Sequence, residues 1–227
     1  MISGIPRPAG RSARGAVAML LAGLVVGALA GCGGTGPGRR PAASAATTSA
    51  SAVGPGQRLA ERALLGAADL PLGFEAQESG SDTQAMGCRG IDALYLGSGV
   101  TGRAAASFTH TLSDVYVNET VTTRPGTASA TLAAFRQAST DCRTFGTGAA
   151  TYKVATVNGI GQYGDGTAAL SIAGSMRESR PVVVVVVRID DLVLVVAHAD
   201  SGRIDPEVTR TLVGRAVAKA QRALTGS

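Results

Sequence analysis

Six consecutive valines, at positions 182–187, constrain the fold of this chain more than any other feature of its sequence. Valine favours strands because its branched side chain is restricted in helices. A run without alternating polar residues indicates a strand covered on both faces. A second apolar run, residues 192–199, follows after Asp190-Asp191, which suits a tight turn. The sequence therefore predicts a central β-hairpin inside a sheet that is covered on both faces.

Helical and strand periodicities extend this pattern across residues 57–227. We expect helices over residues 57–70, 127–143 and 205–224, and further strands over residues 104–112, 115–123, 152–157 and 168–172. The glycine-rich stretch 75–102 is expected to be mostly loop. The order α-β-β-α-β-β-β-β-α has too few helical crossovers for a parallel sheet. The sequence thus predicts an α+β fold, with a central antiparallel sheet of about six strands packed against three helices.

The N-terminal segment has the organisation of an export signal. Arg7, Arg11 and Arg14 precede a charge-free apolar stretch over residues 16–30, which ends in Leu29-Ala30-Gly31-Cys32. This stretch is shorter than the roughly 20 residues that span a bilayer. It is therefore predicted to direct export and not to form a membrane helix.

The tetrapeptide that ends at Cys32 resembles the lipobox of bacterial lipoproteins. The resemblance implies a signal peptide over residues 1–31, cleavage before Cys32, and a diacylglyceryl group on the Cys32 thiol. Two acyl chains hold a protein stably in a bilayer. We therefore expect a lipid-anchored protein on the extracytoplasmic face of the cell membrane. The alternative is an ordinary signal peptide followed by a chance cysteine.

Removal of residues 1–31 changes the charge of the chain. The full chain has 21 basic and 16 acidic residues, and the first 31 residues hold three arginines and no acid, which leaves 18 against 16. A chain with a net charge of only +2 does not provide the sustained basic face of nucleic-acid-binding proteins, so we expect no nucleic-acid partner. Residues 32–56 are rich in Gly, Pro, Ala, Ser and Thr, and are predicted to form a disordered tether after the lipidated cysteine. Residues 57–227 remain to form one domain.

The two other cysteines, Cys88 and Cys142, suit a disulfide, because disulfides persist in exported proteins. In the chain-entropy model a loop of this length is worth roughly 4 kcal/mol. Two free buried cysteines are the alternative. Neither these thiols nor the two histidines have a metal-ligand spacing, so we expect no metal and no cofactor.

The sequence Gly159-Ile160-Gly161-Gln162-Tyr163-Gly164 matches the dinucleotide-binding fingerprint letter for letter. A Rossmann loop must open a helix, whereas Asp165-Gly166 leads into the strand-like residues 167–172. We therefore interpret this glycine-rich segment as a hairpin loop.

His110 and His198 are the candidate histidine bases, and Asp200 lies two residues after His198. Neither a nucleophile elbow nor a recognisable carboxylate pair accompanies them, so we expect no catalytic residue and no enzyme activity. Ser107 and Thr109 are hydroxyl groups near His110 on the same predicted strand. Polar groups at strand ends are commonly solvated, and we expect the same of His198 and Asp200.

The last predicted helix has a basic side, with Arg210, Arg215, Lys219 and Arg222. Such a face is usually just solvated, but it could also contact anionic lipid headgroups. The sequence leaves both interpretations open.

The order of features resembles the PknH-like extracellular sensor domains of actinobacteria, which occur at the end of receptor kinases and as separate lipoproteins. The likeness covers residues 57–225 and rests on the helix end Asp69-Leu70-Pro71-Leu72-Gly73-Phe74 and on the helix with Ala134-Phe135 and Cys142. It implies a central antiparallel sheet with a ligand cleft, in a non-catalytic sensor or ligand-binding module. The kinase domain has two disulfides, whereas this chain can form one.

Two further functions stay open beside the sensor: a carrier of lipid or other apolar cargo, and a protein-interaction lipoprotein of the cell envelope. The expected partners are thus the membrane, through the lipid anchor, and a small or apolar ligand or an envelope protein. A large enclosed apolar cavity would favour the carrier, a shallow polar cleft the sensor, and converging histidines an enzyme.

Overall fold

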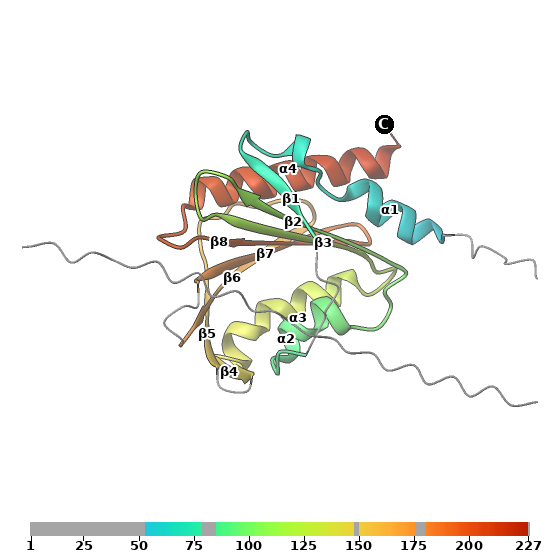
Figure 1. Ribbon diagram of the computed structural model, residues 1–227. Coiled ribbons are helices and arrows are strands. Elements are labelled where there is room, and N and C mark those ends of the chain that lie inside the picture. The colour runs from blue at the N-terminus through green and yellow to red at the C-terminus, as the bar shows by residue number, and fades with distance from the viewer. Residues whose placement is uncertain (1–52, 79–84, 148–149, 176–179, 227) are drawn as a thin grey trace, which may run out of the picture. The chain divides into compact units, whose positions relative to one another are not determined.

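The computed structural model describes residues 53–78, 85–147, 150–175 and 180–226 (Figure 1). Cys32, the predicted signal peptide and residues 32–52 of the predicted tether lie outside these residues. The described part contains helices and strands in this order: α1 (Pro55–Ala63), the 3-10 turn η1 (Ala67–Asp69), β1 (Phe74–Gln77), α2 (Arg89–Leu96), β2 (Gly102–His110), β3 (Tyr116–Thr123), α3 (Ala128–Asp141), β4 (Thr144–Thr147), β5 (Ala150–Thr156), β6 (Gly166–Gly174), β7 (Val182–Ile189), β8 (Leu192–Ala199) and α4 (Pro206–Thr225).

The strands form one antiparallel sheet in the order β1-β2-β3-β8-β7-β6-β5-β4. The predicted α+β class with an antiparallel sheet is therefore confirmed. The described residues form eight strands instead of the predicted six or so, and four α-helices instead of three.

The additional elements are short and lie where the sequence shows little periodicity. β1 begins just before residues 75–102 and α2 lies within them. The sequence predicted mostly loop there, and this prediction is wrong for these two elements. β1 and β4 have four residues each and form the two edges of the sheet, where one strand partner is enough. The first helix ends at Ala63 rather than near Leu70, because the chain turns extended at Leu64.

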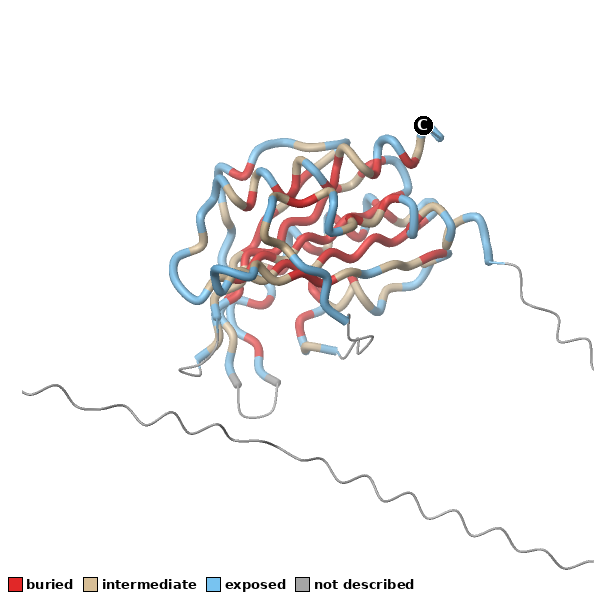
Figure 2. The backbone as a smooth tube through the Cα atoms, turned by 45° about the horizontal axis from the view of Figure 1, so that its top comes forward, coloured by how far each residue is buried: buried red, intermediate tan, exposed pale blue. Residues whose placement is uncertain are grey.

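The two faces of the sheet are covered by different helices. α1 and α4 lie on one face, and α2 and α3 on the other (Figure 1). The sheet between them is buried along its centre (Figure 2). Val183, Val185 and Val187 belong to the core under α1 and α4, whereas Val184 and Val186 belong to the core under α2 and α3. The prediction that the valine strand is covered on both faces is confirmed.

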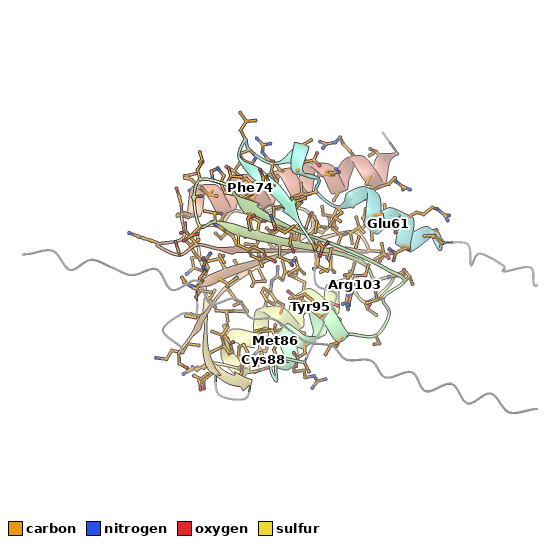
Figure 3. The ribbon with its side chains drawn as sticks, in the orientation of Figure 1. Glu61, Phe74, Met86, Cys88, Tyr95 and Arg103 are labelled. Carbon is orange, nitrogen blue, oxygen red and sulfur yellow. A yellow bond between two sulfur atoms is a disulfide. The ribbon has the colours of Figure 1, made fainter. Side chains whose placement is uncertain are left out.

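A disulfide joins the start of α2 to the end of α3, as predicted: Cys88 and Cys142 are bonded, with their Cα atoms 5.7 Å apart. Figure 3 shows Cys88 on the α2 side of the sheet, with Tyr95 at the other end of the helix. Close packing adds to the bond, since a Cβ on Gly90 would lie 2.4 Å from the carbonyl oxygen of Ala134 in α3. α2 is therefore held against α3 both covalently and by backbone proximity.

Two carbonyl oxygens in the last turn of α2 accept hydrogen bonds from arginine side chains, one from β2 and one from the residue after β3. The last carbonyls of a helix lack intrahelical partners and carry partial negative charge. Arg124, which is 1% exposed, donates from Nη2 to the carbonyl oxygen of Leu94 at 2.6 Å, and Arg103 donates to that of Tyr95 (Figure 3). These contacts explain why a fully buried guanidinium needs no carboxylate here.

α4 begins and ends as its sequence predicts. The carboxylate of Asp205 accepts the backbone N–H of Glu207 at 2.8 Å, and Pro206 occupies the first helical position. Gly226 ends the helix in the left-handed region, with φ 74°. Both apolar cores described above, the disulfide and these caps are made by residues within 53–226.

Replacing Cys88 and Cys142 together by alanine should lower stability without changing the fold. The bond closes 54 residues, a constraint worth about 4 kcal/mol, or a melting temperature lower by about 10 °C for a domain of this size. Thermal unfolding of both proteins, followed by circular dichroism, measures the difference. Equal melting temperatures, or two alkylatable thiols in the exported wild-type protein, would contradict the expectation.

Candidate functional site

An open cleft of about 460 Å³ lies where β5 leaves the sheet. The last paired residues are Thr156 and Leu170, and the N–H of Val157 still donates to the carbonyl oxygen of Ala169 at 2.9 Å. After that point the chain loops outward and returns only at Gly166, the start of β6. The lining comes from α3, from this loop and from β6: Arg136, residues 156–162 and residues 167–170.

The loop that forms one wall of the cleft is fixed to the rest of the domain. Ile160 is 3% exposed and belongs to the core under α1 and α4. Arg210 of α4 donates from Nη1 to the carbonyl oxygen of Gly159 at 2.8 Å, and the N–H of Tyr163 donates to Oγ1 of Thr167 at 2.7 Å. The wall is thus formed before any ligand arrives.

Polar and apolar groups face each other across the cleft. The exposed guanidinium of Arg136 donates to the carbonyl oxygen of Thr167 at 3.2 Å, which orients it along β6. Asn158 and Gln162 contribute exposed amides, whereas Ala169 and Leu170 contribute apolar surface. Such a lining suits a small ligand that combines an apolar part with a few hydrogen-bonding groups.

The glycine-rich segment is a hairpin loop, as interpreted from the sequence. It joins β5 to β6, which pair antiparallel, and it opens no helix. Gly164 has φ 53°, and a Cβ there would lie 2.4 Å from the carbonyl oxygen of Arg188. Glycine is needed at that position for close approach of two backbones. The amino-acid sequence of this loop does not predict that the loop lines a cleft.

The structure does not bring the two histidines together. β3 separates β2, which carries His110, from β8, which carries His198. The His110 ring packs edge-on against Phe74, with 5.1 Å between centroids, and its Nδ1 lies 3.0 Å from the hydroxyl of Ser113. Asp200 accepts the N–H of Gly202 at 2.8 Å, whereas His198 is hydrogen-bonded to Thr209 and not to Asp200.

The two hydroxyl groups that precede His110 on β2, those of Ser107 and Thr109, lie on the other face of the sheet. Side chains alternate along a strand, so Ser107 and Thr109 point away from the face that carries Phe108 and His110. The hydroxyl of Tyr116 and the amide of Asn118 each donate to Ser107 Oγ at 3.0 Å. This contact places Ser107 in a structural hydrogen-bond group between β2 and β3.

His198 is completely buried, so the expectation that it is a solvated strand-end group is wrong. Its Nδ1 lies 2.8 Å from Oγ1 of Thr209, which itself donates to the carbonyl oxygen of Asp205 at 3.1 Å. The hydroxyl proton is therefore used, and Nδ1–H of a neutral imidazole must be the donor. Burial lowers the pKa of His198, more than Asp200 and Asp205 raise it. His198 thus ties the first turn of α4 to β8 as a neutral ring.

Glu119 is a buried carboxyl group in the sheet face under α1 and α4. Its Oε2 accepts the N–H of Leu65 at 2.6 Å, and Oε1 has no partner among the described residues. Burial raises the pKa of Glu119 to about 8, although the Leu65 N–H and Lys219 act to lower it. The signal in the sequence was a carboxylate at an inward position between Val117 and Val121.

Within the part of the chain that the structure describes, no group of three or more His, Cys, Asp or Glu residues is placed to hold a metal ion. No helix within the same part is long and apolar enough to cross a membrane.

Exchange of Glu119 for glutamine should remove a pH dependence of stability. Between its ordinary pKa of 4.5 and about 8, the folded protein keeps the Glu119 proton and the unfolded chain loses it, so stability falls as pH rises. The wild-type free energy of unfolding should drop by about 1.4 kcal/mol per pH unit relative to Glu119→Gln, which keeps an acceptor for Leu65. Urea unfolding of both proteins, at about pH 6.5 and about pH 7.5, measures this; parallel changes would refute it.

Comparisons with known proteins give a fold but no family. No family model matches the sequence, and no curated protein matches it. Among solved structures, the extracellular domain of PknH from Mycobacterium tuberculosis matches with a TM-score of 0.56 and 13% identity, over 73% of this chain and 96% of that chain. An uncharacterised protein from Mycobacterium smegmatis aligns with a TM-score of 0.38 and 16% identity, over 52% of this chain and 64% of its own. The folded part of this chain therefore has the fold of the PknH extracellular domain.

Proposed function

We propose that this chain is a lipoprotein anchored through Cys32 to the extracytoplasmic face of the membrane, and that its folded domain is a non-catalytic sensor or ligand-binding module. The observation that supports a ligand-binding module is the preformed cleft between α3, the loop after β5, and β6. The lipobox at residues 29–32 supports the lipid anchor.

Three features of the cleft support ligand binding. Its volume, about 460 Å³, lies in the range of small-molecule sites. Its wall is held by a hydrogen bond that Arg210 donates and by one that Thr167 accepts, so binding would order few groups. Its lining combines the polar side chains of Arg136, Asn158 and Gln162 with apolar residues of the loop and of β6, a mixture that would orient a ligand. The likeness to the extracellular domain of a mycobacterial protein, PknH, supports the same location and module type.

The runner-up function is a carrier of lipid or other apolar cargo. A carrier would enclose its cargo among apolar side chains, whereas this cleft is open and includes Arg136, Asn158 and Gln162. A non-catalytic role is further supported by the separation of His110 from His198 and by the use of Ser107 within the β2–β3 hydrogen-bond group.

A large side chain in the cleft should abolish ligand retention. Gln162 lines the cleft and is exposed, so Gln162→Trp would occupy its space without disturbing the core. Gln137→Trp, at an exposed position of α3 outside the lining, is the matched control. Native mass spectrometry of the protein, extracted mildly from its host, should show an added mass in wild type and in Gln137→Trp but not in Gln162→Trp. An added mass that survives Gln162→Trp would place the ligand elsewhere and reject the cleft, and its absence from wild type would reject ligand retention.

Cys32→Ala should leave the exported protein without lipid, because the thiol is the acyl acceptor in the proposed anchor. Incorporation of radiolabelled palmitate in the producing bacterium measures this. The double variant Cys88→Ala/Cys142→Ala, which also removes cysteines, should keep the label. Undiminished labelling of Cys32→Ala would reject the anchor and leave the cleft proposal intact.

A further inference from the structure

The C-terminal half of α4 and the end of α1 form a one-sided basic surface. Residues 214–225 of α4 contain Arg215, Lys219 and Arg222 and no acidic residue. Arg62 adds a cation from the last turn of α1. Arg62, Arg215 and Arg222 are exposed, and Lys219 is half-buried. We call these four residues the basic patch.

Three members of the basic patch converge on a pocket between α1 and α4. Arg62, Lys219 and Arg222 line a cavity of about 270 Å³, together with Ala223 and Gly226. Arg62 of α1 reaches α4 through a hydrogen bond from its Nη2 to the carbonyl oxygen of Ala223, 3.4 Å long. Guanidinium groups match the geometry of phosphate oxygens, and a lysine adds a point charge, so the pocket is suited to a phosphate group.

The Asp69 carboxylate next to the pocket does not neutralise it. Asp69 pairs with Lys219, and Arg215 donates to the Asp69 carbonyl oxygen at 2.6 Å. Asp69 can balance one charge, and the other three cations of the basic patch form no ion pair with a described residue. Cations near helix C-termini also compensate the helix dipole. That effect accounts for each cation alone, but not for their convergence from two helices.

An apolar tip lies next to the basic patch. Leu72 is 98% exposed, and Leu112, in the turn after β2, is 90% exposed. A hydrogen bond from the N–H of Thr111 to the carbonyl oxygen of Gly73, 2.8 Å long, holds the two turns together. Leu72 follows Asp69 by three residues, at most about 11 Å of chain. Figure 1 shows the segment before β1 on the same side of the sheet as α1 and α4.

We propose that this face docks on an anionic lipid bilayer. The pocket takes the phosphate of a lipid headgroup, the remaining cations contact neighbouring headgroups, and Leu72 and Leu112 enter the interface. Charge complementarity argues for this partner, because cations beside exposed apolar side chains are the combination that holds proteins at bilayer surfaces. The docking goes beyond the proposed function, since it needs neither Cys32 nor the cleft.

The test uses residues 53–227, which form one compact unit with every described helix and strand but lack Cys32. Binding is measured by sedimentation with phosphatidylcholine vesicles with and without phosphatidylglycerol. Binding should require phosphatidylglycerol and weaken with salt. Arg62→Gln/Arg222→Gln should bind about 25-fold more weakly, at about fivefold per charge. Arg89→Gln/Arg143→Gln removes two exposed charges from the opposite side of the sheet and should bind like wild type.

A second variant, Leu72→Ser/Leu112→Ser, leaves every charge in place and should also weaken binding; its sites are too exposed to affect folding. Equal binding to both kinds of vesicle, or equal loss in the two arginine variants, would overturn the proposal. A titration with inorganic phosphate distinguishes a site for free phosphate from a site for lipid headgroups. The Arg62 and Arg222 signals are followed by NMR during the titration. Phosphate binding without vesicle binding would mean a site for free anions and would overturn docking. None of these results bears on palmitate labelling at Cys32.

Discussion

Burial of β7 on both of its faces is the constraint on which the rest of this structure depends. Val183 to Val187 are at most 7% exposed, and alternate residues belong to two separate cores. A strand of this kind cannot lie at an edge or leave one side of the sheet in water, because each exposed valine would lose roughly 1.5–3 kcal/mol of burial. The sheet must therefore continue on both sides of β7, and helices must cover both faces.

The position of the cleft follows from that central strand. β6 pairs with β7 from Gly166 to Ile172, but it pairs with β5 only from Leu170 onward. The N-terminal part of β6 is thus fixed by β7 on one side and free of a strand on the other. Arg136 occupies part of this edge through the carbonyl oxygen of Thr167, and the glycine-rich loop closes the remainder into a cleft.

Elements with strong local signals could be predicted from the sequence. The valine hairpin, the β2–β3 hairpin and the capped α4 each show their own periodicity or turn residues. β1, β4 and α2 could not be predicted, because four-residue edge strands have no measurable period, and α2 depends on the disulfide and on Arg124.

The candidate site shows the same limit more strongly. The disulfide could be predicted because, with Cys32 assigned to the lipid anchor, Cys88 and Cys142 are the two cysteines that remain in the sequence. The cleft joins Arg136 to residues 156–170, and the basic patch joins Arg62 to Lys219 and Arg222, so each depends on contacts between distant segments. The burial of His198 likewise depends on the docking of α4, which its neighbours on β8 do not encode.

The two pairs of helices are held together by different chemistry. α2 and α3 are joined by a disulfide, which does not titrate. α1 and the turn after it have, besides their apolar packing, three polar contacts: Leu65 with Glu119 of β3, Asp69 with Lys219 of α4, and Arg62 with Ala223 of α4. Lys219 lies close enough to Glu119 to lower the pKa of that carboxyl, and it also lines the pocket of the basic patch. A phosphate in the pocket would offset the charge of Lys219 and weaken this effect, favouring the protonated form of Glu119.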